Sequence, residues 1–96
     1  MPDLQELRHR IDAIDRAVVD LLNERTTVAM QIGRNKLAEG LPVYDPVREE
    51  EIIRNVTASL PGPLSAQAIR RVFERIMDET RSVERRSTEP SDPRKA

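Results

Sequence analysis

A stripe of apolar residues at alternating steps of three and four runs along residues 4–32, and it limits the folds open to this chain. That spacing is typical of the face that an α-helix buries, and its members are Leu4, Leu7, Ile11, Ile14, Val18, Leu21, Val28 and Ile32. The pattern predicts one helix from about Pro2–Asp3 to Glu39, where Gly40 stops it. At about 1.5 Å per residue this helix is about 54 Å long, far longer than the average helix of a globular protein.

Capping signals mark the start of each predicted helix. Asp3 is the expected N-cap of the long helix. Asp45, followed by Pro46 at the first helical position, is the expected N-cap of a second helix, which ends by Leu60. Ser65 is the expected N-cap of a third helix.

No segment shows the alternation typical of a strand, so the predicted fold class is all-α with three helices per chain, one of them very long. The third helix is expected to continue to about Arg85, and residues 1–86 are expected to form one helical domain. Residues 87–96 are polar and contain proline, and we expect them to be a disordered tail.

The predicted helix lengths do not fit a monomer. The second and third helices would span about 24 Å and about 30 Å, too short to cover an apolar stripe of about 54 Å. A strict three–four repeat is also typical of helices that associate with one another. We therefore expect an intertwined homodimer in which the long helices pair.

Arg25 is the one residue that interrupts the apolar stripe. Burying an unpaired guanidinium costs several kcal/mol, so an anion is expected to meet it. Lys36 follows about 20° round the helix and about 16 Å along it, with small or apolar residues between the two. Two inward cations that bracket an apolar stretch predict a pocket for a small polyanion. An ion pair with a neighbouring acid is the alternative explanation of Arg25.

Composition argues against several classes of function. The 96 residues include no Cys, which excludes a disulfide framework and a thiolate metal site. The one histidine, His9, stands between two arginines on a charged face, so no metal site is expected. The formal net charge is −1 with acids and bases interspersed, which argues against nucleic acid or an anionic membrane as a partner. No apolar run approaches the roughly 20 residues of a membrane span, and the first residues do not resemble a signal peptide. A cytoplasmic protein is expected.

Further polar residues could face the same pocket. Asp45, Arg48 and Glu49 fall on one side of the second helix, while Thr80 and Glu84 lie four apart on the third. Singly, they have ordinary explanations as a cap, surface charges, a packed hydroxyl and a solvated acid.

Arg8 could reach such a pocket only across a dimer. It lies 17 residues from Arg25, which is about 25 Å along the helix. In an antiparallel pair the start of one long helix lies beside the middle or end of the other, so Arg8 could enter the pocket of the partner chain.

The joint spacing of these residues resembles that of the all-helical chorismate mutases. The resemblance covers about residues 4–85 and is carried by Leu7-Arg8-x-x-Ile11-Asp12-x-Ile14-Asp15, Leu21-Leu22-Asn23-Glu24-Arg25, Ile32-Gly33-x-x-Lys36 and Pro42-Val43-Tyr44-Asp45-Pro46-x-Arg48-Glu49. It implies an isomerase of the shikimate pathway to aromatic amino acids. Such an enzyme rearranges chorismate to prephenate in a domain-swapped helical dimer, without a cofactor.

The same resemblance implies roles by position. Arg25 and the partner subunit's Arg8 would hold the substrate carboxylates. Lys36 would reach a carboxylate and the ether oxygen, and Glu49 would take the ring hydroxyl.

Four further positions complete the implied site. Asp45 and Arg48 would shape the end near the ring hydroxyl. On the third helix, Thr80 would contact a carboxylate, and Glu84 would fall where the family places Gln or Glu at the ether oxygen. Arg81 departs from the pattern, because many relatives have an apolar residue there.

The residues suit this chemistry. A Claisen rearrangement is intramolecular and needs a folded substrate conformer, charge clamps on two carboxylates and positive charge at the breaking C–O bond. Two alternatives stay open. One is an isochorismate–pyruvate lyase, which shares the fold and the anion clamp. The other is a non-catalytic helical dimer that regulates another shikimate-pathway enzyme as its partner.

Overall fold

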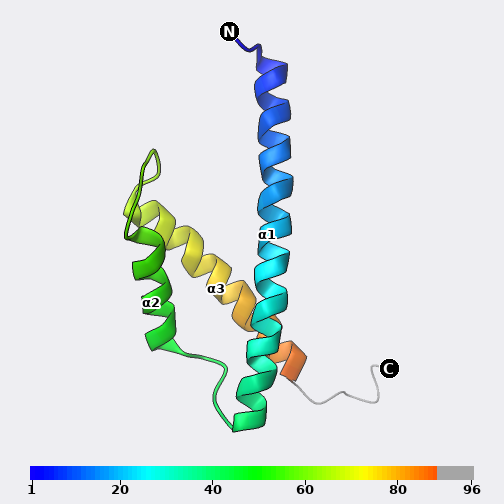
Figure 1. The fold of residues 1–96 in the computed structure, drawn as a ribbon, viewed down its shortest axis with the longest axis vertical. Coiled ribbons are helices and arrows are strands. Elements are labelled where there is room, and N and C mark those ends of the chain that lie inside the picture. Colours follow the sequence, from blue (N-terminus) through cyan, green and yellow to red (C-terminus); the bar gives the residue numbers. More distant parts are fainter. Residues whose placement is uncertain (89–96) are drawn as a thin grey trace, which may run out of the picture.

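The structure, a computed structural model, describes residues 1–88 of the chain. Within that range it contains three α-helices and no strand, which are α1 (Leu4–Glu39), α2 (Pro46–Thr57) and α3 (Ala66–Thr88) (Figure 1). The prediction of an all-α chain with one very long helix is confirmed.

Side-chain caps begin the helices where the sequence predicts them. The carboxylates of Asp3 and Asp45 and the hydroxyl of Ser65 each accept a hydrogen bond from the backbone N–H three residues on, at 2.8, 3.1 and 3.1 Å. Gly40 follows α1 with φ 72°, the left-handed conformation that glycine adopts without strain.

α2 ends at Thr57, before Leu60 as predicted, whereas the end of α3 differs from the prediction. α3 continues to Thr88, two residues into the predicted tail, because the first proline after its start is Pro90. The rest of the predicted tail, residues 89–96, lies outside the described residues.

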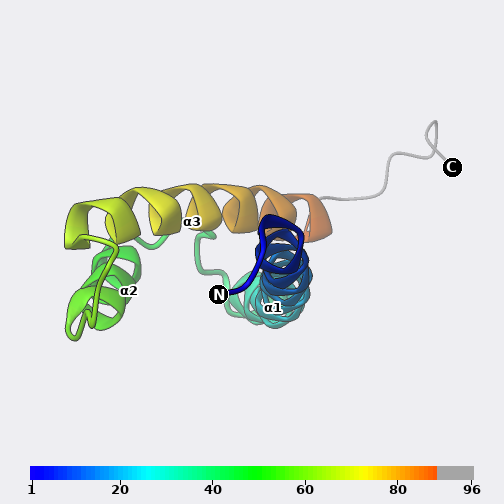
Figure 2. The same cartoon turned by 90° about the horizontal axis from the view of Figure 1, so that it is seen from above.

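α3 packs against both other helices, whereas the backbones of α1 and α2 do not approach each other closely within residues 1–88. Figure 2 shows α1 and α2 on the same side of α3. α3 crosses the C-terminal part of α1, and the N-terminal half of α1 stands apart from both other helices (Figure 1). The long helix is therefore supported by its own chain over only part of its length.

The core is small and lies along α3. Its buried apolar side chains come one from each helix, Ala29, Ile53 and Met77. Gly33 lets α1 approach α3 closely, because a Cβ added there would lie 3.4 Å from Cβ of Glu84. The close crossing brings the polar residues of α3 next to the interrupted part of the α1 stripe.

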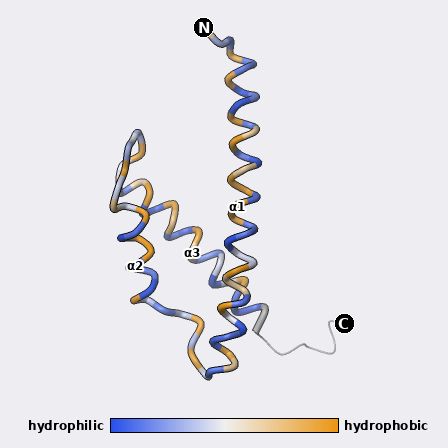
Figure 3. The backbone as a smooth tube through the Cα atoms, viewed as in Figure 1, coloured by the Kyte–Doolittle hydropathy of each residue, from blue (hydrophilic) through white to orange (hydrophobic). Residues whose placement is uncertain are grey.

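Most of the apolar stripe on α1 is exposed in the single chain. Orange apolar positions recur along the whole of α1 in Figure 3, and the side chains of the N-terminal half are between 43% and 64% exposed: Leu4, Leu7, Ile11, Ile14, Val18 and Leu21. Across residues 1–88 no helix combines the length and the apolar character needed to cross a bilayer.

Candidate active site

A cavity of about 480 Å³ opens between the three helices, within the size range of small-molecule sites. α1 contributes Arg25 and Lys36 to the lining, and the apolar Val28, Ala29 and Ile32 lie between these two cations along the helix. The structure thus places the two cations of the interrupted stripe around an apolar stretch.

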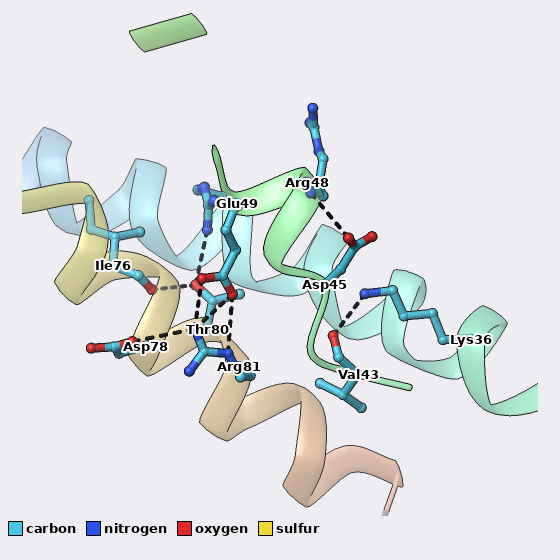
Figure 4. A network of polar contacts seen from close by, with 10 residues as sticks. Lys36, Val43, Asp45, Arg48, Glu49, Ile76, Asp78, Thr80 and Arg81 are labelled. Carbon is cyan, nitrogen blue, oxygen red and sulfur yellow. Dashed lines mark hydrogen bonds and ion pairs between the residues drawn. The ribbon is translucent and has the colours of Figure 1, made fainter. Parts of the chain in front are cut away.

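Arg25 and Lys36 are both half-buried and hydrogen-bonded. Nη1 of Arg25 donates to the hydroxyl of Thr80 on α3 at 3.0 Å, and that hydroxyl donates to the carbonyl of Ile76 at 2.8 Å. Nζ of Lys36 donates to the carbonyl of Val43, in the connection between α1 and α2, at 2.9 Å (Figure 4). These contacts hold the two cations toward the cavity from opposite ends.

The start of α2 forms a second wall. Asp45 and Arg48 both line the cavity, and Asp45 also caps the helix through the backbone N–H of Arg48. The guanidinium of Arg48 forms an ion pair with Glu51 on the same helix, and its side chain is half-exposed. Arg48 is therefore the least enclosed cation of the site.

Glu49 is bound by an arginine from α3. Both carboxylate oxygens of Glu49 accept from Nη2 of Arg81, at 2.9 and 2.7 Å, and Oε2 also accepts from Nε at 3.2 Å (Figure 4). The Arg81 guanidinium lies 4.8 Å from the centre of the Tyr44 ring. This pair joins α2 to α3 at the rim of the cavity.

Two polar side chains of α3, Thr80 and Glu84, are buried at the cavity. Burial raises the pKa of Glu84, and Glu49 raises it further, while the charges of Lys36, Arg25 and Arg81 act in the opposite direction. A raised pKa favours the protonated carboxyl, which can donate a hydrogen bond into the cavity.

The structure brings seven of the eight predicted site residues to this one cavity: Arg25, Lys36, Asp45, Arg48, Glu49, Thr80 and Glu84. Arg8 does not line it and lies exposed on the N-terminal half of α1. Among residues 1–88, no group of three or more His, Cys, Asp and Glu side chains is placed to hold a metal ion.

Sequence reasoning missed three cavity features. They are the pair between Arg81 and Glu49, the carbonyl of Val43 that binds Lys36, and Glu24 in the lining. For Arg81 a signal existed, because Met77, Thr80, Arg81 and Glu84 follow the i, i+3, i+4, i+7 spacing of one helix face. The carbonyl of Val43 carries no signal in the residue type.

The fold and the cavity define an all-helical protein with a cation-lined pocket of small-molecule size. The family model described as chorismate mutase type II matches residues 7–85, which is most of the chain. The chain belongs to the chorismate mutase type II family.

Solved structures and curated relatives agree with this assignment. A chorismate mutase from Thermus thermophilus (form II) is 40% identical, with a TM-score of 0.85 over 86% of this chain and 94% of that one. A chorismate mutase from Helicobacter pylori, solved in complex with prephenate, is 26% identical, with a TM-score of 0.84 over 93% of this chain and 97% of that one.

A curated relative is longer than this chain. The bifunctional chorismate mutase/prephenate dehydratase of Aquifex aeolicus is 33% identical over 90 residues, which are 90% of this chain and 25% of that protein. The chain therefore spans about a quarter of the length of this relative.

Proposed function

We propose that this chain catalyses the rearrangement of chorismate to prephenate. One observation carries the proposal: the cavity sets Arg25 and Lys36 at the two ends of an apolar floor and faces them with the buried Thr80 and Glu84. Chorismate is a ring with two carboxylates and an ether-linked enolpyruvyl group, so it needs charge at separate points and an apolar surface between them. Membership of the chorismate mutase type II family supports the same reaction.

Arg25 and Lys36 are the proposed carboxylate clamps within the chain. Charge-assisted hydrogen bonds from a guanidinium or ammonium to a carboxylate are about twice as strong as neutral ones. Thr80, already joined to Arg25 at 3.0 Å, adds a hydroxyl beside the same carboxylate. Together these groups hold the folded conformer in which the two reacting carbons lie close, which supplies much of the rate enhancement in intramolecular reactions.

Lys36 and Glu84 are proposed to act on the ether oxygen. As the C–O bond breaks and the new C–C bond forms, negative charge builds on that oxygen, and fixed donors there stabilise the transition state. A rate enhancement of about 10⁶ requires about 8 kcal/mol, and one well-placed donor supplies about 3–4 kcal/mol. The raised pKa of Glu84 extends toward higher pH the range in which its carboxyl is protonated and can act as this donor.

The remaining roles concern the other end of the cavity. Glu49 is the proposed acceptor for the ring hydroxyl, with Asp45 and Arg48 shaping the cavity around it. The dehydratase fused to the Aquifex relative supports a link to other enzymes of the pathway. A physical partner of that kind and a cytoplasmic location stay predictions.

We also propose that the active form is an intertwined antiparallel homodimer with two composite sites. The exposed apolar side chains on the N-terminal half of α1 support it. Burying the exposed half of six such side chains is worth on the order of 5–9 kcal/mol per chain, before the cost of association. In this arrangement the partner subunit's Arg8 enters the cavity and supplies its remaining carboxylate clamp.

Direct assay tests the proposed reaction. Purified protein is given chorismate, the loss of its absorbance is followed and prephenate is identified, and isochorismate is tested in parallel for release of pyruvate. We expect turnover of chorismate alone. Pyruvate release without prephenate would favour the lyase, and turnover of neither substrate would favour the non-catalytic dimer.

A matched pair of variants ties that activity to the cavity. Arg25→Met should abolish most turnover, whereas Arg75→Met should not, because Arg75 forms only an exposed ion pair with Glu79 on α3. Equal activity of the two variants would show that turnover does not arise in this cavity.

A further inference from the structure

We propose that Arg81 is a positioning residue that fixes Glu49 for the ring hydroxyl of the substrate. The inference rests on the proposed function and deepens it. It starts from a contact between α2 and α3 that joins two residues 32 positions apart in sequence.

The contact has the geometry of a two-pronged arginine–carboxylate pair. Nη2 and Nε of Arg81 reach Glu49 at distances from 2.7 to 3.2 Å, and both carboxylate oxygens are engaged. The two side chains are only 20% and 26% exposed. A planar fork that meets a planar carboxylate sets the direction as well as the distance of the acceptor.

Arg81 is itself held from the side away from the substrate. Arg81 and Glu49 each line the main cavity and also a second cavity of about 400 Å³, so the pair forms part of the wall between the two cavities. From the second cavity the ring of Tyr44 lies 4.8 Å from the guanidinium, and Oδ1 of Asp78 lies 3.4 Å from Nη2. The fork of Arg81 is therefore directed at Glu49.

The positive charge of Arg81 also reduces the electrostatic repulsion between Glu49 and a dianionic substrate. Four acidic and four cationic side chains line the main cavity, and Arg81 is one of the four cations. Without Arg81 the charge of Glu49 would have no direct counter-charge, and Glu49 would repel the substrate carboxylates across a half-buried space.

A positioned Glu49 keeps an acceptor site for the ring hydroxyl. An ionised carboxylate has about four lone-pair sites, so a hydroxyl can bind an oxygen that Arg81 already contacts. A glutamate without Arg81 would sample several rotamers, and substrate binding would then have to order them at a cost in entropy. Arg81 thus acts on the reaction through Glu49 and not by touching the substrate.

A double-mutant cycle separates this role from a purely structural one. Arg81→Met should lower kcat/KM for chorismate by about 10- to 100-fold, the value of a hydrogen bond to a charged group. In the Glu49→Gln background the same change should cost about threefold or less, because its effect passes through Glu49.

A substrate analogue without the ring hydroxyl gives an independent readout. For this analogue Arg81→Met should lower kcat/KM by about threefold or less, because the contact that Arg81 orients is no longer made. Arg81→Lys keeps the charge without the fork, so it should lie between wild type and Arg81→Met on chorismate.

The chain offers a matched control. Arg70 and Glu50 form another arginine–glutamate pair between α3 and α2, at 3.2 Å, and neither lines the main cavity. Arg70→Met and Glu50→Gln should each change kcat/KM by about twofold or less, as expected of an exposed pair. Circular dichroism and thermal unfolding compare the folding of all variants, and Arg81→Lys replaces Arg81→Met in the cycle if the latter does not fold.

The outcomes are distinct. If wild type produces no prephenate, the proposed function fails and this inference falls with it. If wild type is active but the loss from Arg81→Met is the same with Gln at position 49, or the same for the analogue, only the positioning role is overturned. Loss confined to chorismate and to the Glu49 background supports it.

Discussion

Mixing two inactive variants should restore activity if the sites are composite. Arg8 does not line the cavity of its own chain and lies about 25 Å from Arg25 along α1. Arg8→Ala and Arg25→Ala should each lower kcat/KM by about 10- to 150-fold, the value of a hydrogen bond between charged groups. The two variants remove cations that belong to the same pocket but come from different chains.

The expected recovery follows from the two-fold symmetry. In an equal mixture with free subunit exchange, half of the dimers carry one chain of each kind. Each of these heterodimers has one intact pocket and one pocket that lacks both arginines. The mixture should therefore show about a quarter of wild-type activity at equal chain concentration.

The assay follows chorismate absorbance before and after exchange, with the heterodimer fraction measured by native mass spectrometry on chains of different mass. Mixing Arg25→Ala with the doubly substituted chain is the control, because no dimer in that mixture contains Arg25. Verified exchange with no gain in rate would refute the composite site, and so would full activity of Arg8→Ala alone.

Further predictions concern Glu84 and Lys36 in the cavity and Gly33 where α1 crosses α3. Because burial raises the pKa of Glu84, kcat should rise as pH falls through that raised pKa, and Glu84→Gln should flatten the profile; an unchanged profile would place Glu84 outside the reaction. Protonated Glu84 contributes its full stability to the fold below the ordinary glutamate pKa of about 4.3. That contribution is lost as pH rises through the raised pKa of the folded state. Glu84→Gln, which cannot ionise, should therefore unfold at a higher temperature than wild type at pH 7. Lys36→Ala should lower kcat more than it raises KM, because it meets charge that develops in the transition state; a change in KM alone would contradict that role. Gly33→Leu should lower the free energy of unfolding by about 1–3 kcal/mol in urea titration, because even a Cβ at that position lies 3.4 Å from Glu84; full stability would mean that α1 and α3 separate at little cost.

The helices could be predicted because their signals are local. The apolar repeat of α1 and the caps Asp3, Asp45 and Ser65 each act within a few residues, and the structure has them where the sequence places them. The end of α3 at Thr88 was harder to predict, because no proline or glycine stops the helix between Arg85 and Thr88.

The residues of the site could be predicted from the sequence, but the side-chain contacts between them could not. Arg25 and Lys36 are recognisable as cations among apolar neighbours, whereas the Arg81–Glu49 pair depends on how α3 lies against α2. The direction of the Glu84 pKa shift also needs the packed structure, because burial and three nearby cations act against each other.

The polar partners of the two α1 cations bear on how easily the site is filled. Arg25 donates to a hydroxyl and Lys36 to a backbone carbonyl, both uncharged acceptors. A carboxylate that arrives replaces these neutral hydrogen bonds with charge-assisted ones, without first displacing a carboxylate from either hydrogen bond. Neutral acceptors therefore hold Arg25 and Lys36 toward the cavity, and the charge-assisted interactions of these two cations are left for a dianionic substrate.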